Sequence, residues 1–247
     1  MAKISAEIPV EKLIAKQVQL WAVRERLREL GKEPLKDPWC CGYVAISRNV
    51  GSRAGQVAQI VADSLGWQVF GREIVEKIAC QANLRQSVVE SFDEKRQSEI
   101  QTWIQTIIDR RALGPDRYLR HLLQVLLTIA QHGQAVIIGR GAYLVLPPER
   151  GVRVWITAPV EKRIEVLRRE HGISRDEARR MIVTRDAERS DWMRRMFHAD
   201  PDDPTGYDLV INTGYLEPAD AAELIIRALE RRFGCPRPSL RPAHANA

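Results

Sequence analysis

The segment RNVGSRAG, residues 48–55, has the composition and the setting of a phosphate-binding turn. It follows the short apolar run YVAIS and precedes a helical pattern, QVAQIVADSLG. A turn between a strand and a helix offers an anion the unpaired amides of the first helical turn and the positive end of the helix dipole. Gly51 and Gly55 allow the backbone to curl around a phosphate. A turn with two glycines is also ordinary architecture, so the motif alone leaves both interpretations open.

The usual phosphate-loop fingerprint, G-x-x-x-x-G-K-[ST], is absent from the chain. When the segment from Gly51 to Ala54 is laid over its second half, Ala54 takes the place of the lysine and Gly55 the place of the serine or threonine. The ammonium that binds the β- and γ-phosphates and the hydroxyl that binds Mg²⁺ are therefore both missing. Arg53, one position earlier, is the cation that could compensate.

Arg140 lies between Gly139 and Gly141, directly after the apolar run AVII. In parallel α/β sheets the ligand crevice lies outside the carboxyl ends of the strands. A guanidinium at that place can bind a phosphate through two parallel hydrogen bonds. The alternative is a structural salt bridge, and we favour the phosphate ligand.

A later helical segment is rich in basic residues, and phosphoryl transfer requires positive charge over the migrating group. A mobile basic lid supplies that charge while it excludes water. The candidate arginines of this segment are Arg163, Arg168 and Arg169. The alternative is a solvated helix surface, in which they pair with the carboxylates of Glu161, Glu165 and Glu170.

Five short apolar runs predict buried strands. They are Tyr43–Ser47, Trp67–Phe70, Ala135–Ile138, Val152–Thr157 and Asp208–Asn212. Helical patterns lie between them and after them, at residues 54–65, 72–82, 98–112, 116–132, 159–170, 174–197 and 218–233. Strands that alternate with helices predict a parallel sheet covered on both faces, with right-handed crossovers.

Five segments, in order along residues 43–230, resemble the cytidylate kinase-like family. The first, ISRNVGSRAGQVAQIVADSLGWQVFGREIVEKIA, resembles its opening strand, turn and helix, and AVIIGRGAYLVL resembles its third strand. The segment VRVWITAPVEKRIEVLRRE resembles its fourth strand and the start of its lid, SRDEARRMIVTRDAERSDWMRRMF its lid and returning helix, and YDLVINTGYL its last strand. Two positions depart from the family pattern: Gly55, where relatives usually carry a basic residue, and Gly71, where an aspartate is expected.

The resemblance implies a three-layer α/β/α P-loop kinase-like fold with a five-stranded parallel sheet in the order 2-3-1-4-5. The P-loop domain would span residues 41–233. A helical acceptor-binding region is expected at residues 72–132 and a lid at residues 160–200.

The resemblance also implies roles for individual residues. Those expected to bind ATP are Arg48, Gly51, Ser52, Arg53, Ala54, Gly55 and Gln56. Those expected to bind the acceptor are Arg72, Arg140, Arg185 and Asp186, and those expected to act in catalysis are Arg53, Arg163 and Arg168. Arg185 and Asp186 reproduce the first half of the family segment R-D-x-x-D-x-x-R, whereas Arg189 and Trp192 replace its second half. A surface charge pair is the alternative for Arg185 and Asp186.

The two ends of the chain lie outside the resemblance. Residues 6–30 have a helical pattern that ends at Gly31. We expect residues 1–40 to be a helical extension, which either packs on the domain or forms a homo-oligomer through residues 6–30. The Pro-rich segment at residues 234–247 is expected to be disordered.

Composition limits the class of protein. The chain has 247 residues, of which 45% are hydrophobic and 28% charged, as in an ordinary globular protein. Its net charge of +6 suits anionic partners, with nucleotides preferred over nucleic acid. No apolar run is long enough for a membrane span, no signal peptide is evident, and no Cys or His spacing indicates zinc, so the metal ligands are unknown. The expected location is the cytoplasm.

We therefore expect a nucleoside monophosphate kinase-like enzyme that transfers the γ-phosphoryl group of ATP to CMP or a related nucleotide, with Mg²⁺. A nucleotide-binding regulator or pseudokinase is the alternative, because the lysine and the hydroxyl of the phosphate loop are missing. A basic protein associated with nucleic acid is a third and weaker interpretation.

Overall fold

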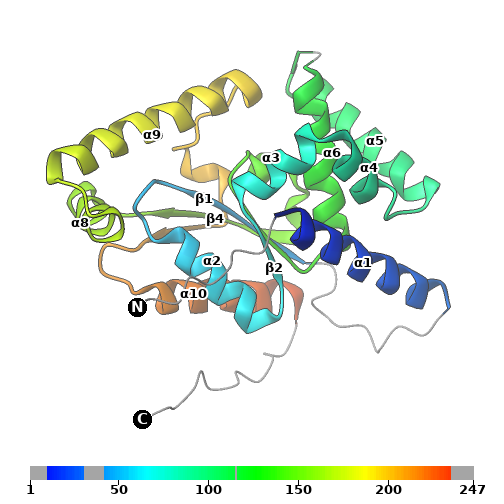
Figure 1. The fold of residues 1–247 in the computed structure, drawn as a ribbon, viewed down its shortest axis with the longest axis horizontal. Helices are drawn as coiled ribbons and strands as arrows, with labels where there is room; N and C mark the ends of the chain where they lie inside the picture. The colour runs from blue at the N-terminus through cyan, green and yellow to red at the C-terminus, as the bar shows by residue number, and fades with distance from the viewer. Residues whose placement is uncertain (1–9, 31–41, 115, 235–247) are drawn as a thin grey trace, which may run out of the picture.

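The computed structural model describes residues 10–30, 42–114 and 116–234. Within these residues a parallel sheet of five strands forms the centre of the molecule (Figure 1). The strands are β1 (Tyr43–Arg48), β2 (Gln68–Phe70), β3 (Ala135–Ile138), β4 (Gly151–Thr157) and β5 (Leu209–Asn212). Their order is β2-β3-β1-β4-β5, and every neighbouring pair is parallel, so the predicted sheet and strand order are confirmed.

Alternate residues of the central strand β1 face opposite sides of the sheet and enter two separate hydrophobic cores. Tyr43 and Ala45 belong to one core, whereas Val44 and Ile46 belong to the other. The neighbouring strand β3 divides its residues between the same two cores. Because both faces of these strands are buried, the sheet requires a layer of helices on each side.

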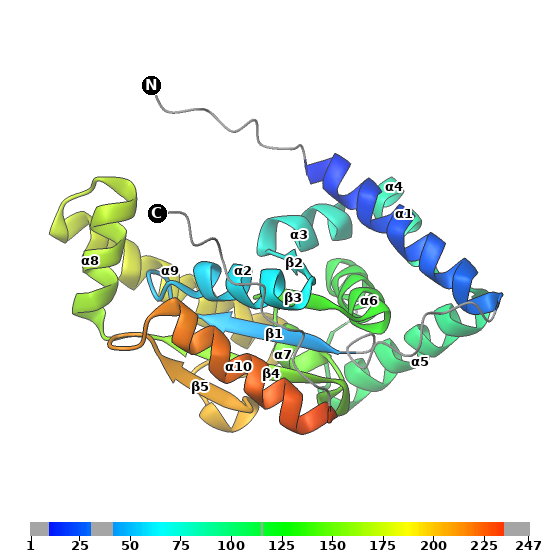
Figure 2. The same cartoon turned by 90° about the horizontal axis from the view of Figure 1, so that it is seen from below.

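Two helices, α2 (Ala54–Leu65) and α10 (Pro218–Phe233), cover one face of the sheet (Figure 2). The other face is covered by α3 (Arg72–Cys80), α6 (Arg117–His132) and the short helix α7 (Ala142–Val145). The predicted three-layer arrangement is therefore present, although α7 was not predicted.

The helical region between β2 and β3 contains two further helices, α4 (Ala82–Val89) and α5 (Glu94–Arg110). The sequence predicted one helix over residues 72–82, but the backbone at Gln81 leaves the helical region and α4 follows as a separate helix. Helix α5 begins four residues earlier than predicted because Asp93 caps it by accepting from the Arg96 amide at 2.8 Å.

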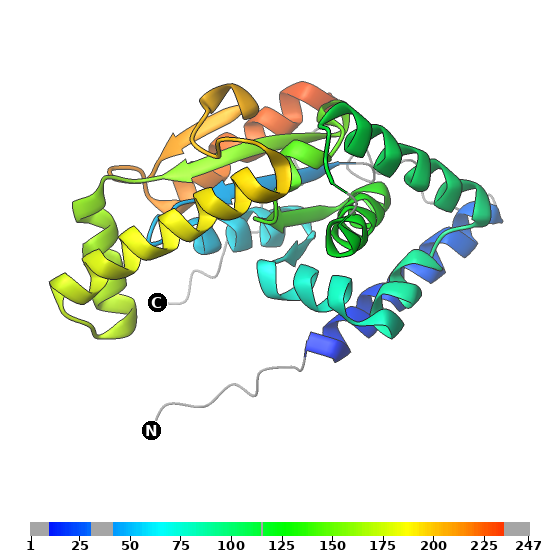
Figure 3. The same cartoon turned by 90° about the horizontal axis from the view of Figure 1, so that it is seen from above.

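After β4 the chain forms a pair of helices, α8 (Val160–His171) and α9 (Arg175–Phe197). Figures 1 and 3 show this pair at the opposite end of the molecule from the helical region α3–α6, and the end of α9 enters the same core as that region through Met193 and Phe197. Four residues between the two helices form a small core of their own, which consists of Ile164, Leu167, Ala178 and Ile182. The pair corresponds to the segment for which we predicted a lid.

Helix α1 (Val10–Glu29) packs on the helical region of its own chain, along its outer edge (Figure 3). The Trp21 ring is 2% exposed and stacks on the His132 ring, with 4.2 Å between the ring centroids. Glu25 pairs with Arg96 at 3.1 Å. Packing on the domain, one of the two expected roles of this helix, is thus present. The other, a homo-oligomer through residues 6–30, stays a prediction.

Parts of the predicted extension and tail, residues 1–9, 31–41 and 235–247, lie outside the described residues. No helix in the described ranges is long and apolar enough to cross a membrane.

Candidate functional site

The predicted phosphate-binding turn forms the connection between β1 and α2. Its loop, residues 49–53, passes through two left-handed positions, Gly51 with a φ of 76° and Arg53 with a φ of 57°. No side chain caps α2, and within the described chain the amides of Ala54 and Gly55 have no hydrogen-bond partner. These amides and the dipole of α2 are therefore available to an anion.

Side chains behind the loop fix its shape. Ser52 Oγ donates to the carbonyl of Asn49 at 2.8 Å, and Thr213 Oγ1 donates to the carbonyl of Ser52 at 2.8 Å. Trp155 Nε1 donates to Asn49 Oδ1 at 2.9 Å. The Ser52 amide also bonds to the carbonyl of Asn49. Ser52 is thus a support of the loop and has no free donor for the predicted contact with ATP.

Arg53 points away from the phosphate-binding amides. Its guanidinium donates to the carbonyls of Thr213 and Leu216 and to Glu217 Oε2, each at 2.8 Å. These three bonds join the phosphate loop to the segment between β5 and α10. We therefore correct the expectation that Arg53 replaces the missing lysine, because its hydrogen-bonding capacity is used by the fold.

Arg163 is buried under the lid and joins it to the phosphate loop. Its Nε donates to the carbonyl of Val50 at 2.7 Å, and its Nη2 donates to Asp186 Oδ2 at 2.5 Å. A Cβ on Gly51 would lie 2.9 Å from the Arg163 carbonyl, so only glycine allows this approach of α8. In this arrangement Arg163 joins α8 to the phosphate loop and to α9, and its expected catalytic role stays a prediction.

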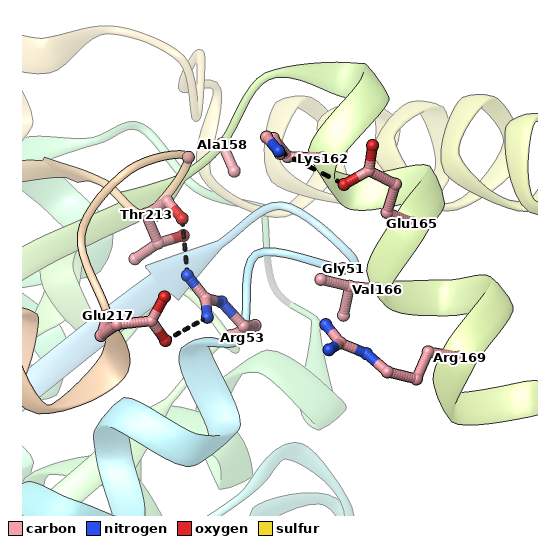
Figure 4. Close-up of a pocket in the computed structure, with 10 residues that line it drawn as sticks. Gly51, Arg53, Ala158, Lys162, Glu165, Val166, Arg169, Thr213 and Glu217 are labelled. Atoms are coloured by element: carbon pink, nitrogen blue, oxygen red, sulfur yellow. Dashed lines mark hydrogen bonds and ion pairs between the residues drawn. The ribbon is translucent and has the colours of Figure 1, made fainter.

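A cavity of about 220 Å³ opens between the phosphate loop, α8 and the β5–α10 segment (Figure 4). Two cations of α8, Lys162 and Arg169, line it, and Figure 4 shows Arg169 extending toward the turn at Gly51. Lys162 pairs with Glu165 at 3.4 Å, whereas Arg169 has no ion pair or hydrogen bond within the described chain. Gln56, predicted to bind ATP, lines the adjoining space.

Arg168, predicted to be catalytic, is exposed and does not line this cavity. The sequence analysis missed Lys162 and ranked Arg169 below Arg168. The spacing of Lys162 and Arg169 was the available signal, because residues seven apart lie on one face of a helix. Arg163 and Leu167 lie on the face that contacts the phosphate loop instead.

Arg48 is the last residue of β1, and its side chain has no ion pair or hydrogen bond within the described ranges. Solvent reaches this side chain, yet the surrounding protein desolvates the guanidinium and lowers its pKa, and the neighbouring charge of Arg72 lowers the pKa further. Arg48 therefore lies at the carboxyl edge of the sheet, partly surrounded by protein. The nearby charge of Glu73 raises its pKa and so opposes these two effects in part.

Arg140 follows β3, the strand next to β1, and has a φ of 52° between two left-handed glycines. Its side chain is 7% exposed, forms an ion pair with Glu76 and lies under the Trp192 ring, 4.8 Å from the ring centroid. The Glu76 contact lacks hydrogen-bond alignment, and within the described chain neither Nε nor Nη2 of Arg140 has a hydrogen-bond acceptor. The fold thus buries a guanidinium whose Nη2 meets the Glu76 carboxylate and whose Nε has no acceptor among the described residues.

Arg72, the second predicted acceptor ligand at this edge, begins α3 and is 57% exposed. Its Nε lies 3.3 Å from Glu76 Oε2, so the Glu76 carboxylate bridges Arg72 and Arg140. Glu76 was not singled out by the sequence. Its position one turn after Arg72 on α3 was the only local signal.

The predicted pair Arg185 and Asp186 is divided by the structure. Asp186 accepts from Arg163 and, at 3.5 Å, from the Val50 amide, whereas Arg185 is exposed and pairs with Glu188 at 3.0 Å. Adjacent residues on a helix point in different directions, and here each side chain has its own partner, so their joint role in acceptor binding stays a prediction. Arg189 was missed: it donates to Ser47 Oγ at 3.1 Å and to the Pro201 carbonyl at 2.9 Å, which ties α9 to β1.

The residues present do not form a protein-held Mg²⁺ site. Within the described chain no group of three histidine, cysteine or carboxylate residues is placed to hold a metal ion. Gly55 stands where a hydroxyl ligand would be needed, and the nearby Ser52 hydroxyl is bonded to the backbone. We therefore assign no protein ligand to Mg²⁺. The free amides and the cations of the cavity do fit the phosphates of ATP.

Comparison with known proteins finds cytidylate kinases that resemble this chain in sequence. Cytidylate kinase of Ignicoccus hospitalis is 29% identical over 156 residues, which are 63% of this chain and 90% of that protein. Cytidylate kinase of Methanocaldococcus jannaschii is 28% identical over 107 residues, which are 41% of this chain and 59% of that protein.

A crystal structure of an uncharacterized protein from Eubacterium ventriosum has the same fold. Its TM-score is 0.61 at 20% identity, and the likeness covers 77% of this chain and 99% of that chain. The model of the cytidylate kinase-like family matches residues 43–215, which extend from the first strand of the sheet to the segment after the last. The chain therefore belongs to the cytidylate kinase-like family.

Proposed function

We propose that this protein is a nucleoside monophosphate kinase-like phosphotransferase, which moves the γ-phosphoryl group of ATP to CMP or a related nucleotide. A bond forms between an acceptor phosphate oxygen and the γ-phosphorus while the bond to the β-phosphate oxygen breaks, which gives ADP and a nucleoside diphosphate. The observation that carries the proposal is Arg140, a buried guanidinium at the carboxyl end of β3 that is paired only with the half-buried Glu76 and whose Nε has no acceptor among the described residues. The next strand, β1, leads directly into the phosphate loop.

On the donor side, ATP phosphates would bind at the amides of Ala54 and Gly55. Arg169 and Lys162 would add positive charge from the α8 wall of the cavity. Charge placed over the triphosphate in a site that excludes water stabilises the transition state of phosphoryl transfer. In this proposal Arg169 performs the task that we first expected of Arg163 and Arg168.

Arg48 would lie between the ATP phosphates and the acceptor phosphate and face the transferred phosphoryl group. It ends β1, the strand that lies next to β3, which leads to Arg140, and that continues into the phosphate loop beside the cavity. Parallel strands bring their carboxyl ends to one edge, so Arg48 and Arg140 share that edge. An arginine without an internal partner is suited to neutralise charge that moves from donor to acceptor.

A nucleotide-binding regulator is the second candidate, and a specific observation favours it. Two of the predicted catalytic cations, Arg53 and Arg163, are used to hold the phosphate loop to its neighbours. Together with Ala54 and Gly55, this leaves the loop without a cation of its own. Such a protein would bind a nucleotide and change partner affinity without turnover.

The test is incubation of the full chain with Mg-ATP and each nucleoside monophosphate, followed by separation of the nucleotides. The proposal expects a diphosphate product with at least one pyrimidine monophosphate. ATP binding by calorimetry without any diphosphate product would support the regulator instead.

Two adjacent arginines of α8 provide a matched control for the donor cavity. Arg169→Ala removes a cation that lines the cavity, and Arg168→Ala removes one that does not. We expect Arg169→Ala to lower kcat by about 10- to 100-fold and Arg168→Ala to leave it within about twofold. Equal losses in both variants would contradict the placement of ATP beside α8.

A further inference from the structure

The acceptor side of the site contains a carboxylate where an anionic substrate is proposed to bind. Glu76 of α3 contacts the Arg140 guanidinium through Oε1 and the Arg72 guanidinium, at 3.3 Å, through Oε2. The Arg140 side chain is 7% exposed, Glu76 is 34% exposed and Arg72 is 57% exposed. The three groups therefore form a series from the protein interior to the solvent, with the negative charge in the middle.

The edge of Arg140 that Glu76 contacts is the edge that a phosphate would use. A guanidinium holds an oxyanion through Nε and one terminal nitrogen, as two parallel hydrogen bonds. Nε and Nη2 of Arg140 are the two donors that lack an acceptor, and Nη2 is the atom next to Glu76. One flat face of the same guanidinium is covered by the Trp192 ring. An oxyanion therefore approaches along the edge where the carboxylate already lies.

We propose that Glu76 is a tethered counter-ion of Arg140, which holds the acceptor-phosphate place in the free protein and must leave it when the acceptor binds. Two anions cannot share one guanidinium edge without strong repulsion, so phosphate binding and the Glu76–Arg140 contact exclude each other. This inference rests on the proposed function, because it assumes that Arg140 is an acceptor ligand. It goes further by assigning a specificity role to Glu76.

Arg72 gives the displaced carboxylate a second partner. It lies one helical turn before Glu76 on α3, already contacts the other carboxylate oxygen and is open to solvent. Glu76 can therefore leave Arg140 while it keeps its pairing with Arg72. In this account Arg72 acts through Glu76, as a positioning residue, and does not itself need to touch the acceptor.

The exchange sets a requirement on the substrate. An acceptor has to compensate for the loss of the Glu76–Arg140 ion pair, which a phosphate with two charges and three oxygens does better than a carboxylate or a sulfate monoester. The counter-ion thus selects phosphorylated acceptors over other anions. It also keeps a buried arginine neutralised when no substrate is present.

The test compares Glu76→Gln with Glu73→Gln in the full chain, by calorimetric titration with CMP and with inorganic phosphate. Both substitutions remove one negative charge from α3, but only the half-buried Glu76 contacts Arg140, whereas the exposed Glu73 acts on Arg48 instead. We expect Glu76→Gln to tighten binding of both probes by about 5- to 20-fold, and Glu73→Gln to change it by less than about twofold. Glu76→Asp, which withdraws the carboxylate by one methylene, should give an intermediate gain.

Unchanged or weaker CMP binding in Glu76→Gln would overturn the inference, since Glu76 would then be neutral or would position Arg140 for the substrate. Arg140→Ala separates this result from a failure of the proposed function. If Arg140→Ala weakens CMP binding while Glu76→Gln does not strengthen it, Arg140 is the acceptor ligand and only the counter-ion is refuted. If Arg140→Ala binds CMP as tightly as the wild type, both the counter-ion and the acceptor site are refuted.

The effect of Arg72→Ala on CMP affinity, measured with and without Glu76→Gln, tests the positioning role of Arg72. The inference expects Arg72→Ala to weaken CMP binding by about threefold to tenfold in the wild-type background and to have no effect beyond about twofold in the Glu76→Gln background. An equal loss in both backgrounds would show that Arg72 touches the acceptor directly and would overturn the role given to it here.

Discussion

The arginines on the two sides of β1 differ in how many hydrogen-bond and ion-pair partners the protein gives them. On the side of β4 and β5, Arg53 and Arg163 make hydrogen bonds to backbone carbonyls and to one carboxylate each. On the side of β3 and β2, Arg140 keeps two donors without acceptors, and Arg48 makes no ion pair or hydrogen bond with the described residues. All four lie close to the carboxyl edge of the same sheet.

The difference separates arginines that build the site from arginines that are available to a ligand. A guanidinium has five N–H donors, and once carbonyls and carboxylates occupy them it has little left to offer a phosphate. Burial with unfilled donors costs stability, so its presence indicates that a missing partner repays it. By this criterion we propose Arg140 as a ligand residue. Arg48 is exposed, so its proposed role rests only on the lack of an ion pair or hydrogen bond with the described residues. The bonds of Arg53 and Arg163 hold the phosphate loop to its neighbours.

The largest effect that this comparison predicts is on stability. Arg163→Met keeps the buried aliphatic stem but leaves Asp186 and the Val50 carbonyl without their partner. The free energy of unfolding should fall by about 3 kcal/mol, as for other broken buried ion pairs. Urea denaturation measures it, with Arg168→Met on the same helix as a control that should cost less than about 0.5 kcal/mol. A stable Arg163→Met protein that has lost turnover would return Arg163 to the catalytic role.

The next effect concerns binding and should leave stability almost unchanged. Arg140→Ala removes the proposed acceptor ligand, and its loss should weaken CMP binding by about 2–3 kcal/mol, or roughly 30- to 150-fold. ATP binding and the free energy of unfolding should change by less than about 1 kcal/mol. Calorimetric titration with each nucleotide measures the difference. Equal affinities of mutant and wild type for CMP would make Arg140 a structural salt-bridge residue.

A gain of function is expected from a cation added to the phosphate loop. A Cβ on Gly55 would meet no atom within 4 Å, and relatives of this family usually carry a basic residue at this position. Gly55→Arg should strengthen ATP binding by about 1 kcal/mol at the N-terminus of α2. Gly55→Ala is the control, because it replaces the glycine without adding a cation: it should raise stability by about 0.5–1 kcal/mol without strengthening ATP binding. The gain in stability should be smaller for Gly55→Arg, since the helix dipole opposes a positive charge at the N-terminus of α2. Ala54→Lys is a poorer choice, since Ala54 is 2% exposed within the core beside α2.

The smallest effect is expected at Arg185. This residue is exposed and contacts only Glu188 among the described residues, so Arg185→Ala should change stability by less than about 0.5 kcal/mol. CMP affinity should stay within about twofold of the wild type. A loss of tenfold or more would show that α9 moves on binding and brings Arg185 to the acceptor, which would extend the ligand-binding group beyond the sheet edge.

The fold was predictable to the level of strand order because the sequence alternates short apolar runs with helical patterns. Strands with both faces buried leave few other arrangements. The order itself came from the resemblance to the family. Helix α4 was not predicted, since the predicted helix over residues 72–82 ends where α4 begins and no helix was placed over residues 83–97. Helix α7 is only four residues long, which is too short for a periodic pattern.

The candidate site was predictable in location but not in the task of each arginine. The turn after β1 and the turn after β3 were identified from local signals, glycines next to apolar runs. The partners that engage Arg163 and Arg53 lie 113 and 163 residues away along the chain, and no local pattern reports such contacts. The division of Arg185 from Asp186 follows from helix geometry alone and could have been foreseen.

The stack of Trp21 on His132 has a consequence for the way the chain is made. His132 ends α6, so the N-terminal helix leaves the ribosome long before its partner ring exists. At the usual ~5–20 residues per second the interval is on the order of ten seconds, during which the indole remains uncovered. Helix α1 is therefore synthesised well before the end of α6 on which its indole stacks, and a chaperone that shields apolar nascent segments has an opportunity to bind in that interval.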